Sequence, residues 1–158
     1  NAIKDATLEV EIYMKQKTRD LLFELTVKEG DPDRISNITG TLSGIAGSFD
    51  LSSQRICGEA MNTSFPFART NDKITAHTRL LGTTGLKQSL RIDLTFTDGS
   101  SQTIENDLTD LLKNFNDDMP TPMYITGDLL TPIEADMTAT IVGWENGNEE
   151  NGENIEIY

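Results

Sequence analysis

The strongest constraint on the fold is a period-two alternation of apolar and polar residues. Apolar residues fill every second position of residues 8–14 and again of residues 21–27. Alternation of this length places one side of an extended segment against a core and the other side in water, which is typical of antiparallel strands. We therefore expect a chain built mainly from antiparallel β-sheet.

The middle of the chain repeats this pattern in residues 73–81 and, most clearly, in residues 89–97. Asp98-Gly99 then gives a strong hairpin signal, and residues 102–105 should return beside the preceding strand. We expect the apolar residues of 8–14, 21–27 and 90–96 to be buried in one common core.

Further strands are expected in several shorter runs, which are residues 34–43, 48–56, 123–127, 137–144 and 155–158. The small residues from Gly44 to Gly47 are expected to form a tight connection. One short helix is predicted over residues 107–115, with Asp107 as its cap and an apolar stripe that ends at Phe115.

This pattern predicts an all-β fold, an antiparallel β-sandwich with one short helix. We expect a single sandwich domain over residues 1–158, in which residues 1–17 are either the end of a preceding domain or an edge strand of this one.

The charge of the chain argues against a nucleic-acid partner. There are 26 acidic and 13 basic residues, for a formal net charge of −13, and such a field repels polyanions. The single cysteine, Cys57, allows no internal disulfide. No segment approaches the roughly 20 apolar residues of a membrane-spanning helix.

Residues that could carry out catalysis are scarce. His77 is the only histidine and lies on the outward phase of its run, where we expect a surface residue without a catalytic role. One histidine and one cysteine are too few for a zinc site. The glycine-containing stretch 82–87 lacks the Gly-Lys-Ser/Thr ending of a phosphate loop and is expected to be a hairpin connection. The acidic stretch 145–153 lacks the ligand spacing of a calcium loop. We predict no catalytic residues, no metal and no cofactor, and a protein that is not an enzyme.

Several motifs occur together in an order that resembles a known family. They are Tyr13-Met14-Lys15-Gln16-Lys17-Thr18-Arg19, Asp31-Pro32-Asp33-Arg34-Ile35, Thr41-Leu42-Ser43-Gly44-Ile45-Ala46-Gly47, Leu80-Leu81-Gly82, Asp107-Leu108-Thr109-Asp110-Leu111-Leu112, Phe115-Asn116 and Ile141-Val142-Gly143-Trp144-Glu145. Over nearly its whole length the chain resembles the FimB-type fimbrial anchor and accessory subunits of Bacteroidales, the fimbrillin-related surface lipoproteins.

The resemblance implies a transthyretin- or immunoglobulin-like sandwich that is the C-terminal domain of a secreted, lipidated precursor at the outer membrane. The chain would then meet the membrane only through a lipid anchor that it does not itself carry, since Cys57 lies too far inside the sequence. Arg19 is expected in a turn, and nothing around it marks a processing site.

We therefore predict a structural or adhesion subunit of a bacterial surface fimbria, with other fimbrial subunits as partners. It would assemble by backbone hydrogen bonds along an open sheet edge. The alternative is a module of a surface lipoprotein that binds a glycan or a protein, including host molecules. A hydrolase is disfavoured, because no general acid or base is evident.

The candidate strand-pairing segment is the alternating C-terminal run of Asn154, Ile155, Glu156, Ile157 and Tyr158. Two outcomes are open for this segment. It either completes its own sheet as an edge strand or pairs with a neighbouring subunit.

Overall fold

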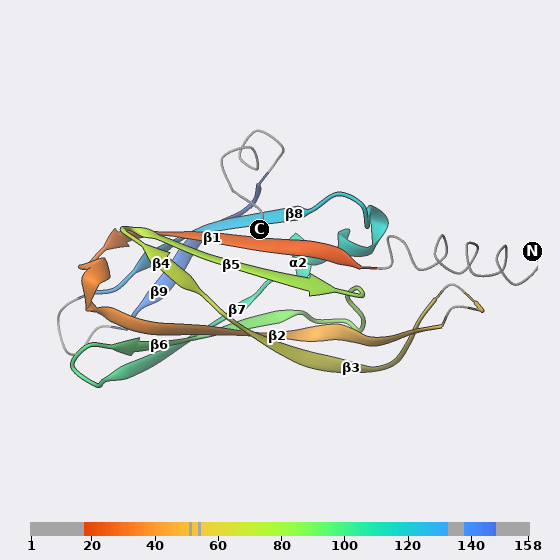
Figure 1. The fold of residues 1–158 in the computed structure, drawn as a ribbon, viewed down its shortest axis with the longest axis horizontal. Helices are drawn as coiled ribbons and strands as arrows, with labels where there is room; N and C mark the ends of the chain where they lie inside the picture. The colour runs from red at the N-terminus through yellow and green to blue at the C-terminus, as the bar shows by residue number, and fades with distance from the viewer. Residues whose placement is uncertain (1–17, 51, 54, 133–137, 148–158) are drawn as a thin grey trace, which may run out of the picture.

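Two β-sheets packed face to face make up the fold (Figure 1). The computed structural model describes residues 18–50, 52–53, 55–132 and 138–147, and within these it contains nine strands. The strands are β1 (Arg19–Glu29), β2 (Ile35–Asp50), β3 (Arg55–Pro66), β4 (Ala68–Thr70), β5 (Lys73–Leu80), β6 (Ser89–Phe96), β7 (Ser101–Asp107), β8 (Met123–Leu130) and β9 (Thr140–Gly147). One sheet has the order β4-β5-β1-β8-β9 and the other the order β3-β2-β6-β7. The predicted all-β sandwich is confirmed.

The alternating runs that the structure describes bury their apolar residues in one core. On β1, Leu21, Phe23 and Leu25 are fully buried, and the four apolar residues of β6 are buried in the same cluster. The return strand predicted after Asp98-Gly99 is β7, which pairs antiparallel with β6. The first run, residues 8–14, lies outside the described residues.

One pair of strands at the centre of the larger sheet is parallel. β1 pairs antiparallel with β5 on one side but parallel with β8 on the other, from Leu21 opposite Met123 onward. This pair is an exception in a sandwich whose other strand pairs are antiparallel, as the sequence predicted. The alternation along β1 does not show whether the strand next to it runs parallel or antiparallel. The neighbouring strand β8 comes about a hundred residues later, and Arg19 at the start of β1 already contacts Thr121, 102 residues further on.

The predicted strand at 34–43 is confirmed as the first part of β2, but the predicted connection at 44–47 and the separate strand at 48–56 were wrong. β2 runs without interruption through Gly44 and Gly47 to Asp50, and the chain turns back after Asp50, which pairs with Arg55. Gly44 has φ +71° and sits where the pairing with β3 slips by one residue, so it forms a bulge rather than a turn. The turn is supported by Asp50, whose Oδ1 accepts hydrogen bonds from the Ser52 backbone N–H and hydroxyl at 2.9 and 2.8 Å.

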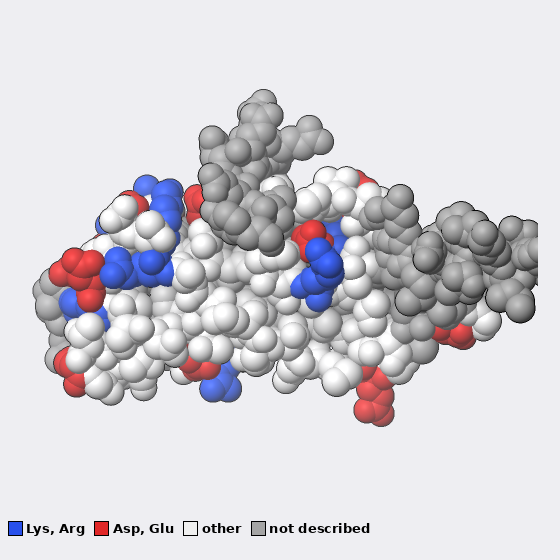
Figure 2. Space-filling view, in the orientation of Figure 1, with Lys and Arg blue, Asp and Glu red and all other residues white. Residues whose placement is uncertain are grey.

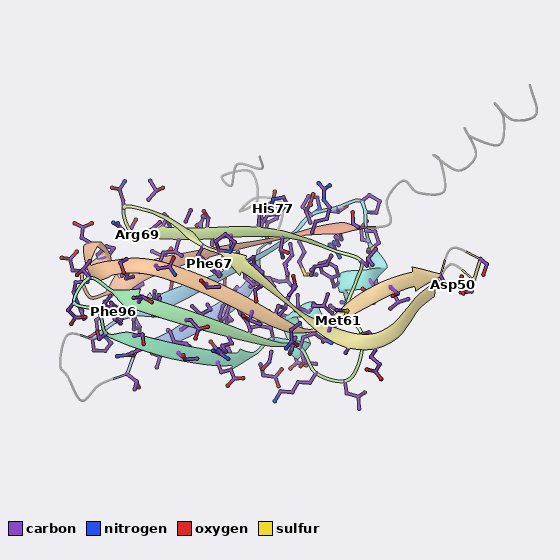
Figure 3. The ribbon with its side chains drawn as sticks, turned by 60° about the horizontal axis from the view of Figure 1, so that its bottom comes forward. Asp50, Met61, Phe67, Arg69, His77 and Phe96 are labelled. Carbon is purple, nitrogen blue, oxygen red and sulfur yellow. The ribbon has the colours of Figure 1, made fainter. Side chains whose placement is uncertain are left out.

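β3 passes directly into the other sheet as β4. At this corner the rings of Phe23 and Phe65 stack with centroids 5.8 Å apart, and Phe67 packs against both. Figure 3 shows Phe67 at the crossing from β3 to β4. Gly40 lies beneath the rings, and a Cβ there would approach Phe67 Cε1 to 2.7 Å. Glycine is therefore required at this position for close packing.

Residues 82–87 connect the two sheets rather than forming a hairpin. β5 and β6 belong to different sheets, so the predicted hairpin connection was wrong. The connection is fixed to β2 by the Ala46 N–H, which donates to the Gly82 carbonyl, and by the Thr84 N–H, which donates to the Gly44 carbonyl.

In the part of the chain that the structure describes, the helical segments are short turns. They are α2 (Thr109–Leu112) and the 3-10 turns η1 (Pro32–Arg34) and η2 (Phe115–Asp117). The predicted short helix is confirmed but is shorter than residues 107–115. Leu108 is the N-cap of α2, so the prediction of Asp107 as the cap was wrong by one residue. Asp107 Oδ1 does accept a hydrogen bond from the Thr109 N–H at 2.9 Å, and Leu112 and Phe115 are fully buried.

The sequence predicted Arg19 in a turn, which was wrong. Arg19 is the first residue of β1 and only 7% exposed. Its Nε donates to the Thr121 carbonyl at 2.5 Å and its Nη1 to the Phe115 carbonyl at 2.6 Å. The guanidinium also lies over the Phe115 ring, 5.2 Å from the centroid. Burial lowers the pKa of Arg19, against the opposing charges of Asp118 and Asp117. Arg19 thus fixes the start of β1 to the segment that precedes β8.

Replacing Leu94 by Asp is expected to unfold the domain. Leu94 is fully buried, and an unpaired buried carboxylate costs several kcal/mol against a total stability of about 5–15 kcal/mol. The control is Thr95→Asp, at the neighbouring position on the outward phase of β6, which should cost no more than about 1 kcal/mol. Thermal unfolding followed by circular dichroism compares them. A wild-type Tm for Leu94→Asp would show that the register of β6 is wrong.

Arg19→Met is expected to lower the free energy of unfolding by about 1–3 kcal/mol, because two carbonyls lose their hydrogen-bond donor in a largely buried site. Arg79→Met is the matched control. The Arg79 side chain is 64% exposed and pairs with Asp20, so its loss should cost less than about 1 kcal/mol. Urea unfolding measures both variants, and equal effects would contradict the anchoring role of Arg19.

Candidate assembly surface

The candidate segment Asn154, Ile155, Glu156, Ile157 and Tyr158 lies outside the described residues, so its pairing stays a prediction. The last described residue before it is Gly147, which ends β9 and pairs with Tyr124 of β8. Strand pairing also requires an acceptor edge, and each of the two sheets has described edges that could accept a strand.

Within the described part of the chain, the outermost strands are β4 and β9 in one sheet and β3 and β7 in the other. An edge strand presents unpaired backbone N–H and C=O groups, which proteins protect with charge, bulges or short length. On β7 this protection comes from Glu105 and Asp107. On β9 the pairing slips beside Gly143, which has φ +67°.

β3 is the longest of these edges, with 12 residues, and Arg55 and Glu59 are its only charged residues. Its pairing with β2 is irregular at two places, and Gly58 has φ +85° at the second. Exposure rises along the core-facing side, from 5% at Phe65 to 56% at Met61. Toward the hairpin with β2, the core-facing side of β3 thus leaves apolar surface exposed to solvent.

The edge formed by β4 is short. β4 has three residues and pairs only with residues 73–75 of β5. The Val27 N–H donates to the Asp72 carbonyl, and N–H groups alternate in direction along an antiparallel strand. The backbone groups of His77 and Arg79 therefore point away from β1, toward a position that β4 does not reach.

His77 lies on the outer face of β5, as predicted from its phase. Its Nε2 is 3.0 Å from Asp20 Oδ1, and Arg79 Nε donates to the same oxygen at 2.9 Å. Desolvation by partial burial raises the pKa of Asp20, but the hydrogen bonds from His77 and Arg79 outweigh it, so the pKa is lowered. This arrangement is a charge cluster that joins β1 to β5.

Two more ion pairs belong to this part of the molecule, Lys73 with Glu24 at 3.5 Å and Arg69 with Asp33 at 3.3 Å. Figure 2 shows this face, with basic side chains next to acidic ones and uncharged surface between them. The face is therefore locally neutralised although the whole chain is strongly acidic.

A shallow hollow of about 480 Å³ lies between the sheet connection and the start of α2, lined by Leu86, Lys87, Asp107, Thr109 and Asp110. Sequence reasoning missed it, and no motif marks it. The carboxylate of Asp107 already accepts hydrogen bonds from the hydroxyl and the N–H of Thr109. These bonds lower the pKa of Asp107. We assign no ligand to this hollow.

Within residues 18–50, 52–53, 55–132 and 138–147, no group of three or more His, Cys, Asp or Glu side chains is arranged to hold a metal ion. None of the helices described is long and apolar enough to span a bilayer.

Two solved structures are similar to this fold. One is the fimbrial anchor protein Mfa2 from Porphyromonas gingivalis, with a TM-score of 0.54 and 15% identity over 82% of this chain and 46% of that chain. The other is a candidate adhesin from Bacteroides ovatus ATCC 8483, with a TM-score of 0.53 and 13% identity over 78% of this chain and 47% of that chain. The chain thus spans about half the length of each, and at these identities the likeness shows the fold alone. No curated protein sequence matches the chain.

A family model described as "Fimbrillin-A associated anchor proteins Mfa1 and Mfa2" matches residues 1–150, which is nearly the whole sequence. This agrees with the resemblance that the ordered motifs indicated. The chain belongs to the family of fimbrillin-A associated anchor proteins.

Proposed function

We propose that the chain is a non-enzymatic structural subunit of a bacterial surface fimbria and that it joins other fimbrial subunits by β-strand pairing. The observation that carries this proposal is the family match over residues 1–150. Membership in an anchor family supports a fimbrial role at the cell surface. The β-sandwich supports the mode of assembly, because its sheets end in strands with open backbone groups.

The segment of Asn154, Ile155, Glu156, Ile157 and Tyr158 is the strand that this chain would donate. Its two isoleucines alternate with polar or amphipathic residues, so one side can fill apolar pockets while the other faces water. Residues 148–153 link it to β9, and six residues reach at most about 20 Å. The segment can therefore extend beyond its own sandwich to an adjacent subunit.

Residues 1–158 act as one sandwich domain of a larger surface protein, which is held at the outer membrane by a lipid on a cysteine outside this chain. Two observations support this. The chain spans about half of the similar solved chains, and Cys57 lies within β3, where it pairs with Ser48.

Deleting residues 154–158 is expected to abolish incorporation into fimbriae and to leave the Tm of the monomer unchanged. The donated strand would contribute to the neighbour's sheet and not to its own core. Incorporation is measured by immunoblotting of sheared fimbriae, and Tm by differential scanning calorimetry.

The double substitution Ile155→Asp and Ile157→Asp should reproduce the loss of incorporation, whereas Glu156→Gln, on the opposite side of the segment, should not. A sharp fall in Tm with normal incorporation would instead make the segment an internal edge strand. A glycan array with the intact chain tests the rival role, since selective micromolar binding to particular sugars would favour a glycan-binding module.

A further inference from the structure

In the described part of the larger sheet, β5 has an open edge beyond β4. β4 covers residues 73–75 of β5, and within the described part of the chain residues 76–80 have a hydrogen-bonded neighbour only on the β1 side. These five positions include His77 and Arg79, whose backbone groups point to the open edge. One further strand of about five residues would fit here.

The opposite sheet is uncovered at the same side of the molecule. Phe65, Thr63 and Met61 of β3 share the core-facing side, because their partners on β2 are Gly40, Leu42 and Ile45. Phe65 lies under the corner where β4 begins, whereas Met61 lies farther along β3 and is 56% exposed. Figure 3 shows Met61 on β3 between the corner at Phe67 and the hairpin end at Asp50.

We propose that residues 10–14 of this chain form the missing strand, parallel to β5 along residues 76–80. The segment alternates as β5 does, with Val10, Ile12 and Met14 on one side and Glu11 and Tyr13 on the other. The first three complete the apolar layer above Thr63 and Met61. The proposal does not depend on the fimbrial role.

The connection to β1 fits this placement. Arg19 pairs with Leu80 at the end of β5 and is held there by its hydrogen bonds to Thr121 and Phe115. Passing from β1 over β5 to the next strand position requires two strand spacings, or about 10 Å. Residues 15–18 span up to about 14 Å when extended. The added strand must run parallel to β5, since its last residue meets the start of β1.

Charge also favours this occupant. With Met14 beside Leu80, the parallel register places Glu11 beside His77 and Tyr13 beside Arg79 on the outer face. Glu11 adds a carboxylate to the cluster in which His77 and Arg79 already share Asp20. The Tyr13 ring offers a face to the Arg79 guanidinium, whose side chain is 64% exposed.

Hydrogen exchange of the full chain, followed by NMR, tests the proposal. The His77 and Arg79 amides are expected to exchange at least about tenfold more slowly in the wild-type chain than in Ile12→Asp, in which a carboxylate would have to enter the apolar layer. Ile12→Val is the matched control, because it keeps an apolar side chain at the same position and should keep the protection. Oxidation of Met61 by peroxide should be faster in Ile12→Asp than in wild type.

Rapid exchange of His77 and Arg79 in the wild-type chain overturns the proposal, whatever the variants do. Protection that is equal in wild type and Ile12→Asp overturns it too, as does protection that rises with protein concentration, which would make a second copy the occupant. The amides of Ile92 and Leu94 serve as a folding reference in every sample, because their side chains are buried at the centre of the opposite sheet.

Discussion

Phe23, Phe65 and Phe67 form the contact that holds the two sheets together where the chain passes from one to the other. The ring centroids lie 5.7–6.0 Å apart. Phe23 comes from β1 at the centre of one sheet, Phe65 from β3 at the edge of the other, and Phe67 from the link between β3 and β4. Aromatic pairs of this kind stabilise a fold by about 0.5–1.5 kcal/mol more than the burial of their apolar area alone. They require the open space above Gly40. The corner places β3 and β4 at neighbouring edges of the two sheets.

The strands that could be predicted from the sequence are those with one solvent-exposed side and one buried side. β1, β5 and β6 each carry a regular alternation, and their bounds agree with the runs at 21–27, 73–81 and 89–97 within a few residues. β3 could not be found in this way. Its sequence is polar and small, and much of it is exposed on both sides, so no apolar period marks it. The glycines of β2 suggested a turn because a bulge and a turn use the same residue type.

The candidate site was predicted as a segment, not as a surface. The C-terminal alternation indicates a strand, but one strand does not report which sheet accepts it. The acceptor edges depend on where β4 ends and on how β3 bends, and both are properties of distant pairings. For His77, likewise, only part of its environment could be predicted from the sequence. Its outward phase was predictable, whereas its contact with Asp20, 57 positions earlier in the sequence, required the register of β5 against β1.

The irregular pairing of β2 with β3 has a consequence for solubility. An extra residue on β2 near Gly44 is followed by an extra residue on β3 near Gly58, and each bends its strand and increases the local twist. β3, the longest of the described edges, is therefore curved and does not offer a flat template. Two copies of β3 are therefore disfavoured from pairing along the whole strand, even though the strand carries little charge.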